Sequence, residues 1–276
     1  MNHPIAQFVA LTCHANALLQ GRVTTSFWPG NSTCIFCDAV RFVHVSKTPF
    51  GKMREEGVAE TPDAWFGYLQ AAQVSAIRLS STPQKRPKIA DRMSAGMIGG
   101  GRTWTMEARG RDGKRAVWVS RWEVWDQNAP ERRIWRVTYY GARVKPSGSP
   151  PATDLEAVAG RLRSALEDVH GFSQRHRCGG FTDSFAEAID ALESRGAKRH
   201  GYHRDLAPDG VLPAIAASLL DACQPAWVFG GMGSWNDLAF QGEDQTEYER
   251  TSERLFVAVT EAIQAAANAS GPVPGE

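Results

Sequence analysis

The sequence lacks any apolar run long enough to cross a membrane, and it lacks low-complexity blocks. A transmembrane helix needs about 20 consecutive apolar residues, and the apolar stretches here are far shorter. The moderately apolar segment 4–20 has no Lys or Arg ahead of it, and His14 and Asn16 interrupt it. This pattern argues against a secretory signal and favours an amphipathic first helix that ends at Gly21.

Cysteine is scarce, with five residues in 276. An odd number in a long chain without a signal predicts free thiols and a soluble, cytoplasmic protein. Cys34 and Cys37 form the one CxxC pair, in an apolar segment that we expect to be a strand. A zinc site would need a second pair of ligands, and a redox site would need a following helix. Small buried core residues are the favoured interpretation, and no metal ligands are predicted.

A net charge excess is also missing, because 31 basic residues face 30 acidic ones. The charges are nevertheless distributed unevenly along the chain. Residues 78–145 carry 16 Lys/Arg against 6 Asp/Glu, whereas residues 146–276 carry 10 against 19. A basic middle and an acidic end indicate either a surface for polyanions or two halves that complement each other.

Signatures of common nucleotide and hydrolase sites are absent. The glycine-rich segment GMIGGGRTW (96–104) precedes an expected strand, and GGMGSWND (230–237) follows an expected helix. Neither context suits a P-loop or a dinucleotide-binding turn, which follow a strand and open a helix. No serine occupies a GxSxG elbow.

The first half of the chain predicts mainly β-structure. Thr61-Pro62-Asp63 predicts a helix start with Thr61 as N-cap, and residues 74–80 predict a strand. Two strands flank a turn that contains Asp112-Gly113, and a third strand follows near 134–144. Alternation along residues 103–109 predicts that Trp104, Met106 and Ala108 are buried.

The second half predicts helices. KPSGSPPATD (145–154) has the composition of a linker, and Thr153 with Glu156 predicts a capping box. Further helices are expected near 182–195, from Val211 to Cys223, and near 244–268.

The expected fold class is α+β: a curved antiparallel β-meander with flanking helices, followed by an all-helical C-terminal segment of about four helices. Residues 1–145 would form the α+β region with its antiparallel sheet, and 146–153 the linker. Residues 154–276 would form a helical region that packs on the sheet, so that both regions can make one integrated domain.

The segment 230–237 is the leading candidate site. Glycines allow the main chain to donate N–H groups to an anion, and Asp237 is a candidate general base. Ligand contacts are predicted for Gly231, Gly233, Trp235 and Asn236. The structural alternative is that Trp235 fills the core while Asn236 or Asp237 caps a short turn.

Two other segments carry candidate residues. Gly100, Gly101 and Arg102 would form the opposite wall of the same crevice, where Arg102 could clamp a carboxylate or phosphate. His203, in the segment RHGYHRD (199–205), is a second candidate catalytic residue because His titrates near neutral pH. A solvated loop is the alternative for that segment.

The sequence therefore predicts a soluble protein that binds an anionic small molecule or nucleotide in a crevice between the basic sheet and the loop 230–237. No motif identifies a cofactor. One alternative is a nucleic-acid-binding protein that uses Arg102, Arg109, Arg121 and Arg136 with the neighbouring tryptophans. The other is a non-catalytic interaction module.

Overall fold

The computed structural model describes residues 1–22, 25–48, 51–84, 89–97, 100–145, 153–195 and 201–272. In these ranges the protein is α+β, with one six-stranded sheet and seven α-helices. The elements in chain order are α1 His3–Leu19, β1 Cys37–Lys47, β2 Met53–Ala59, α2 Pro62–Ala71, β3 Val74–Thr82, α3 Asp91–Ser94, β4 Thr103–Gly110, β5 Arg115–Val124, β6 Trp135–Val144, α4 Leu155–Arg175, α5 Gly180–Glu193, α6 Ala214–Ala226 and α7 Gly242–Asn268, with 3₁₀ turns η1 Pro130–Arg132 and η2 Trp235–Asp237.

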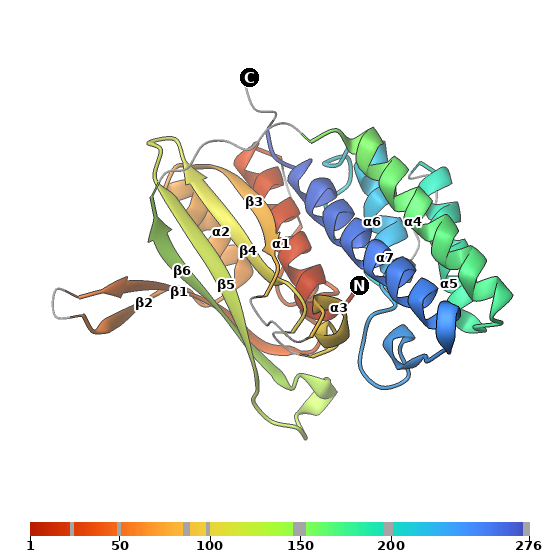
Figure 1. Cartoon of the computed structure of the whole chain (residues 1–276). Coiled ribbons are helices and arrows are strands. Elements are labelled where there is room, and N and C mark those ends of the chain that lie inside the picture. Colours follow the sequence, from red (N-terminus) through yellow and green to blue (C-terminus); the bar gives the residue numbers. More distant parts are fainter. Residues whose placement is uncertain are drawn as a thin grey trace.

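The sheet lies on one side of the molecule and the helices α4 to α7 lie on the other (Figure 1). Its strand order is β2-β1-β6-β5-β4-β3. The chain leaves β2 at one edge, passes through α2 and enters β3 at the other edge. It then returns through antiparallel pairs until β6 lies parallel to β1. The three strands predicted between 103 and 144 do pair antiparallel in order, β4-β5-β6. The sheet as a whole is mixed, because the crossover through α2 leaves β6 parallel to β1, so the predicted antiparallel sheet holds only in part.

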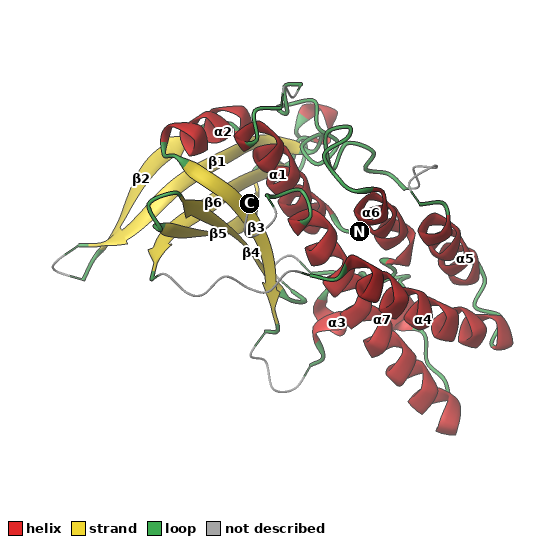
Figure 2. Cartoon of the chain, turned by 90° about the horizontal axis from the view of Figure 1, so that it is seen from above, coloured by secondary structure: helices red, strands yellow, loops and turns green. Residues whose placement is uncertain are grey.

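Helix α1 lies between the sheet and the helical layer (Figure 2). It contacts β3 and β4 on one side, α7 on another and α2 on a third. Every residue from Ile5 to Ala17 is buried, so α1 is a core helix on all sides and the predicted amphipathic pattern, with one polar exposed face, was wrong. The predicted end is correct, since Gly21 follows the helix with φ +76°.

One face of the sheet packs against α1 and α2, and we call it the inner face. Trp104, Met106 and Ala108 of β4 are buried there, which confirms the predicted alternation. Trp118 of β5 pairs with Gly141 of β6 on the same face and is also buried. The inner face is therefore part of a continuous core that extends through the helical layer.

Local signals placed some helix ends correctly. As predicted, the side chain of Thr61 caps α2 by accepting a hydrogen bond from the backbone N–H of Ala64. Trp65, Phe66 and Leu69 form the buried side of this helix. The first C-terminal helix instead uses Asp154 as its N-cap, so Thr153 was the wrong residue. Helix α6 continues through Pro225 to Ala226, beyond the predicted end at Cys223.

The edge strand β3 is covered by side chains from two helices. Asn16 of α1 accepts a hydrogen bond from the N–H of Ile77 (2.8 Å) and donates to its carbonyl (2.9 Å). Asn268 and Gln264 of α7 bind the backbone of Leu79 and Ser81. These amides replace the missing neighbouring strand and join the sheet to the helical layer.

The predicted linker 146–153 falls almost entirely outside the described residues, so the proposed division of the chain stays a prediction. None of the described helices is both long enough and apolar enough to cross a bilayer.

Candidate functional site

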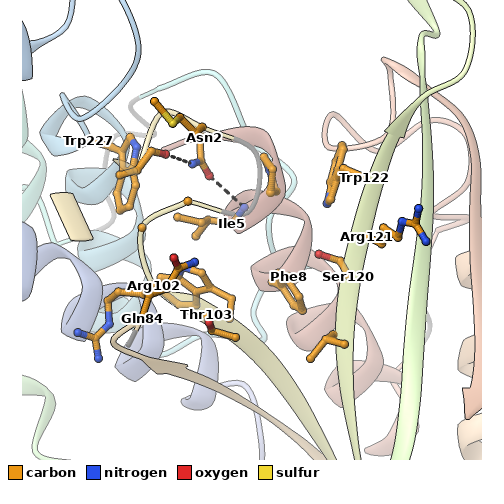
Figure 3. A pocket seen from close by; sticks show the side chains of 17 residues that line it. Asn2, Ile5, Phe8, Gln84, Arg102, Thr103, Ser120, Arg121, Trp122 and Trp227 are labelled. Carbon is orange, nitrogen blue, oxygen red and sulfur yellow. Dashed lines mark hydrogen bonds between the residues drawn. The ribbon is translucent and has the colours of Figure 1, made fainter. Parts of the chain in front are cut away.

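A cavity of about 340 Å³ lies between the N-terminal end of α1 and the inner face of β4 and β5 (Figure 3). Ala95, Met97 and residues 100–102 close a third side, and Trp227, which follows α6, closes a fourth. The wall consists of Asn2, Pro4, Ile5, Phe8, Gln84, Ala95, Met97, Gly100, Gly101, Arg102, Thr103, Trp104, Val119, Ser120, Arg121, Trp122 and Trp227. Gly100, Gly101 and Arg102 are the members of this wall that the sequence predicted.

The glycines at 100 and 101 are required by the turn that forms the wall. A Cβ on Gly100 would lie 1.9 Å from the carbonyl oxygen of Ser94, and Gly101 has φ +72°. Their N–H groups already have partners inside this turn. Gly100 donates to the carbonyl of Met97 (2.8 Å) and Gly101 donates to Oγ of Ser94 (2.9 Å). These N–H groups are therefore not available to an anion.

Two indole N–H groups give the cavity its polar character. Nε1 of Trp122 and Nε1 of Trp227 are both shielded from solvent, and neither has a hydrogen-bond partner among the described residues. Figure 3 shows the two rings on opposite sides of the cavity, with Ser120 beside Trp122. Buried indole N–H groups usually have an acceptor, so this pair requires an explanation.

The two arginines of the wall do not direct their charge into the cavity. The guanidinium of Arg102 donates to Oγ (3.1 Å) and to the carbonyl oxygen (3.2 Å) of Ser81. Arg121 forms an ion pair with Glu123 at 2.9 Å. Figure 3 shows both guanidinium groups pointing away from the cavity. Its interior is thus aromatic and neutral.

The second glycine segment contacts the first but does not line this cavity. A Cβ on Gly96 would lie 2.1 Å from the carbonyl carbon of Gly230 and 2.3 Å from the nitrogen of Gly231. The two backbones therefore pack directly against each other, with no space between them for a ligand. Gly231 and Gly233 are both exposed.

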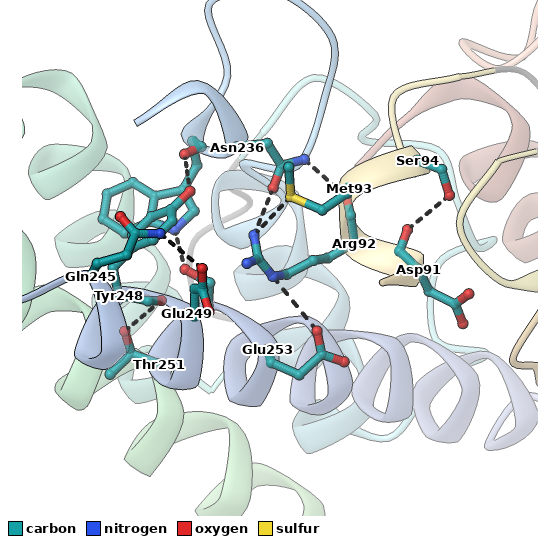
Figure 4. A network of polar contacts seen from close by, with 12 residues as sticks. Asp91, Arg92, Met93, Ser94, Asn236, Gln245, Tyr248, Glu249, Thr251 and Glu253 are labelled. Atoms are coloured by element: carbon teal, nitrogen blue, oxygen red, sulfur yellow. Dashed lines mark hydrogen bonds and ion pairs between the residues drawn. The ribbon is translucent and has the colours of Figure 1, made fainter. Parts of the chain in front are cut away.

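Asn236 connects this segment to α3 (Figure 4). Its Nδ2 donates to the carbonyl oxygen of Arg92 (2.8 Å), and its Oδ1 accepts from Nη1 of Arg92 (3.3 Å). Arg92 is buried, lies over the ring of Tyr248 and is 3.6 Å from Glu253 of α7. Asn236 therefore fastens η2 to α3, and the buried Arg92 in turn joins α3 to α7.

Trp235 is completely buried in the helical layer, so the alternative that it fills the core is correct. Its ring packs edge-on against Phe181 and Phe185, and its Nε1 donates to Oγ of Ser252 (2.7 Å). Asp237 accepts a hydrogen bond from the backbone of Gly233 and stabilises the turn. Each unusual residue of the segment therefore has a structural contact.

His203 belongs to a different cluster, at the junction of the 31–34 turn with the loop before α6. Nδ1 of His203 lies 2.8 Å from Oγ of Ser32, and the same hydroxyl donates to Asp205. Because Ser32 donates its one hydroxyl hydrogen to Asp205, Nδ1 of His203 must be the donor to the Ser32 oxygen. Burial, and then the neighbouring His3, lowers the pKa of His203 to about 4. His203 is 4% exposed and shares no partner with Asp237.

Cys34 lies in the turn before β1, and Cys37 is the first residue of that strand, so the expectation of a CxxC inside a strand was wrong. Both thiols are buried and accept from Nε2 of Gln7 at 3.7 Å. Burial raises the pKa of Cys37 to about 12 and that of Cys34 further. These are inert core thiols. No group of three His, Cys, Asp or Glu residues in the described ranges could hold a metal ion.

The arginines proposed for nucleic-acid binding are engaged by other groups. Arg109 pairs with Glu107, and Arg136 pairs with Asp38 while it stacks on Trp125, 3.1 Å from the ring centroid. These pairs give the nucleic-acid alternative no support, and it stays a prediction.

Sequence reasoning missed Asn2, Phe8 and Trp227 as wall residues. More than 200 residues separate Trp227 from the start of α1, and no local pattern indicates that they meet. Trp122 was detectable only as a tryptophan on the same face as Trp118. Comparison of the chain with protein-family models, with characterised proteins and with solved structures found no match.

Proposed function

We propose that this protein binds a small, uncharged, largely apolar molecule in the cavity between α1 and the β4–β5 strands. The observation that carries the proposal is the pair of unpartnered indole N–H groups of Trp122 and Trp227 across that cavity. A ligand with a flat apolar body and two hydrogen-bond acceptors would satisfy both donors at once.

The dimensions of the cavity support this function. Small-molecule sites commonly enclose about 300–1,000 Å³ and combine apolar walls with a few polar groups. This cavity has about 340 Å³ and four aromatic side chains, those of Phe8, Trp104, Trp122 and Trp227. Rings of this kind contact flat ligands over a large area.

An anionic ligand at the same place has less support. The guanidinium groups of Arg102 and Arg121 are engaged by Ser81 and Glu123, and the N–H groups of Gly100 and Gly101 have partners. An anion in this cavity would lose its hydration without gaining a cation in exchange. The neutral class is therefore the one that we propose.

Coumarin is a suitable probe, because it is neutral and flat and carries two ring-associated oxygens. Calorimetric titration of the full chain should give saturable binding. Trp122→Phe and Trp227→Phe each remove one N–H donor while keeping a ring. Each variant should weaken binding about fivefold, which is the value of one hydrogen bond of about 1 kcal/mol.

Trp125→Phe is the matched control, because Trp125 is 57% exposed and lies outside the cavity. It should leave the affinity unchanged. Coumarin-3-carboxylate, which adds a negative charge to the same ring system, should bind more weakly than coumarin. If both cavity variants bind coumarin as the control does, or if the carboxylate binds more tightly, the proposal is wrong.

Interaction through an exposed surface is a second candidate, supported by one observation. Met97 and Met232 are 69% and 101% exposed, and the contact of Gly96 with Gly230 brings their segments together. Exposed methionines suit adaptable apolar contacts. Light scattering of Met97→Gln, Met232→Gln and the native chain tests whether these residues promote association.

A further inference from the structure

A second cavity, of about 210 Å³, lies at the other end of the inner face of the sheet. The start of β5 forms one wall of it, whereas the end of β5 belongs to the first cavity. Helix α2 and the β4–β5 hairpin form the remaining sides. The wall consists of His44, Tyr68, Leu69, Ala72, Val74, Ala108, Gly110, Asp112, Lys114, Arg115, Ala116, Trp118 and Arg143.

The inner part of this cavity is apolar and depends on Gly141. The ring of Trp118 lies so close to β6 that a Cβ on Gly141 would be 2.7 Å from it. Trp118 is 1% exposed, and its Nε1 has no hydrogen-bond partner among the described residues. Leu69, Val74 and Ala108 line the cavity beside this ring. An apolar ligand body would fit against these groups.

One wall carries a hydrogen-bonded pair of Tyr68 and His44. Nδ1 of His44 lies 3.1 Å from the carbonyl oxygen of Gly141, and Nε2 lies 2.8 Å from the hydroxyl oxygen of Tyr68. A carbonyl only accepts, so Nδ1 carries the hydrogen and Nε2 of the neutral ring accepts from Tyr68. The hydroxyl oxygen of Tyr68 keeps lone pairs for a further contact.

The rim of the cavity is cationic. Lys114 is bonded to Asp112 (2.5 Å), and Arg115 to Glu107 (3.3 Å). Arg143 is exposed and has no carboxylate partner in the described part of the chain. Arg143 lines the same cavity as Tyr68 and His44. A carboxylate would find here the unengaged cation that the first cavity lacks.

We infer that this second cavity is a binding site for a small carboxylate with an apolar body. The guanidinium of Arg143 holds the carboxylate at the rim, and the body of the ligand lies against Leu69, Val74 and the ring of Trp118. The hydroxyl oxygen of Tyr68 gives the wall an acceptor for a donor group on the ligand. This site is independent of the first cavity and of the function proposed for it.

Benzoate is the probe, and benzyl alcohol is its uncharged counterpart. Calorimetry on the full chain should show saturable benzoate binding and no detectable binding of benzyl alcohol at the same concentration. Arg143→Gln should weaken benzoate binding at least tenfold. Arg136→Gln, on the same strand but on the opposite face of the sheet, should leave it unchanged. Melting temperatures of both variants establish that they fold.

A second measurement locates the site. Benzoate should shift the Nε1–H resonance of Trp118, assigned by its loss in Trp118→Phe, because an aromatic ring placed against the indole changes its magnetic environment. Equal benzoate affinity in Arg143→Gln and Arg136→Gln would overturn the inference. So would an unmoved Trp118 resonance at saturation, or equal affinity for benzyl alcohol.

Discussion

Asn268, near the end of α7, forms two hydrogen bonds with the backbone of Leu79 in β3. Its Oδ1 accepts from the N–H of Leu79 (2.7 Å), and its Nδ2 donates to the carbonyl oxygen (2.9 Å). A side chain nearly 190 residues away in the sequence thus acts as one residue of a missing strand. An edge strand whose backbone groups are satisfied in this way offers no template for pairing with another chain.

Asn268→Ala should lower the free energy of unfolding by about 2 kcal/mol, because it leaves a buried N–H and a buried carbonyl of Leu79 without partners. Asn268→Asp keeps the acceptor and loses the donor, so it should also lower the free energy of unfolding. Urea unfolding followed by circular dichroism measures both. Asn128→Ala, at an exposed position, is the control and should change stability by less than about 0.5 kcal/mol.

Gly96→Ala should destabilise the protein, whereas Gly231→Ala should not. A Cβ at position 96 would come within 2.1 Å of the backbone of Gly230, but a Cβ at position 231 would meet nothing within 4 Å. The first variant must separate two packed backbones, which costs about 1–3 kcal/mol. Thermal unfolding of the two variants compares them directly. Equal melting temperatures would contradict the direct backbone contact.

Trp235→Ala should cost about 4 kcal/mol of stability, since large aromatic residues deleted from a core cost about 3–5 kcal/mol. The ring is fully buried and is surrounded by Phe172, Phe181, Phe185 and Tyr248. Trp125→Ala is the exposed control. A stable Trp235→Ala protein with altered ligand affinity would instead support the direct ligand contact that the sequence predicted.

Stability should fall as the pH falls from about 6.5 to about 4. Burial, followed by the nearby His3, lowers the pKa of His203 to about 4, whereas an unfolded His has a pKa near 6.5. In this window the unfolded chain binds a proton that the folded chain does not bind. The contribution of His203 to stability is therefore fully present above the window and is lost as the pH falls through it. Burial also lowers the pKa of His3 and of His14, which adds in the same direction.

The loss attributable to His203 is about 3 kcal/mol across the window. Urea midpoints at pH 7, 6, 5 and 4 measure it, and His203→Gln should reduce the slope. A direct check is the imidazole carbon shift of His203 by NMR, which should report a neutral ring at pH 5. A ring that is already protonated at pH 6 would contradict the effect of burial.

The sequence by itself determined the local structure wherever the residues of one short segment are enough to specify it. Thr61 with Pro62 started α2, and strict alternation buried Trp104 and Met106 on one face of β4. Those outcomes depend only on capping hydrogen bonds and on the alternation of apolar and polar side chains, and both are set by residues close together in the sequence. Gly21 ended α1 for the same local reason.

Only the tertiary structure decided which segments meet. It placed β1 parallel to β6, buried α1 on all sides, and packed Gly96 against Gly230, so that the two glycine segments contact each other instead of facing across a crevice. It also placed Trp227 and Trp122 around one cavity. Within the described part of the chain, Arg102 is engaged by Ser81, whereas Arg143 lines the second cavity without a carboxylate partner. Contacts between distant residues depend on the shapes of whole layers, and no local pattern of residues contains that information.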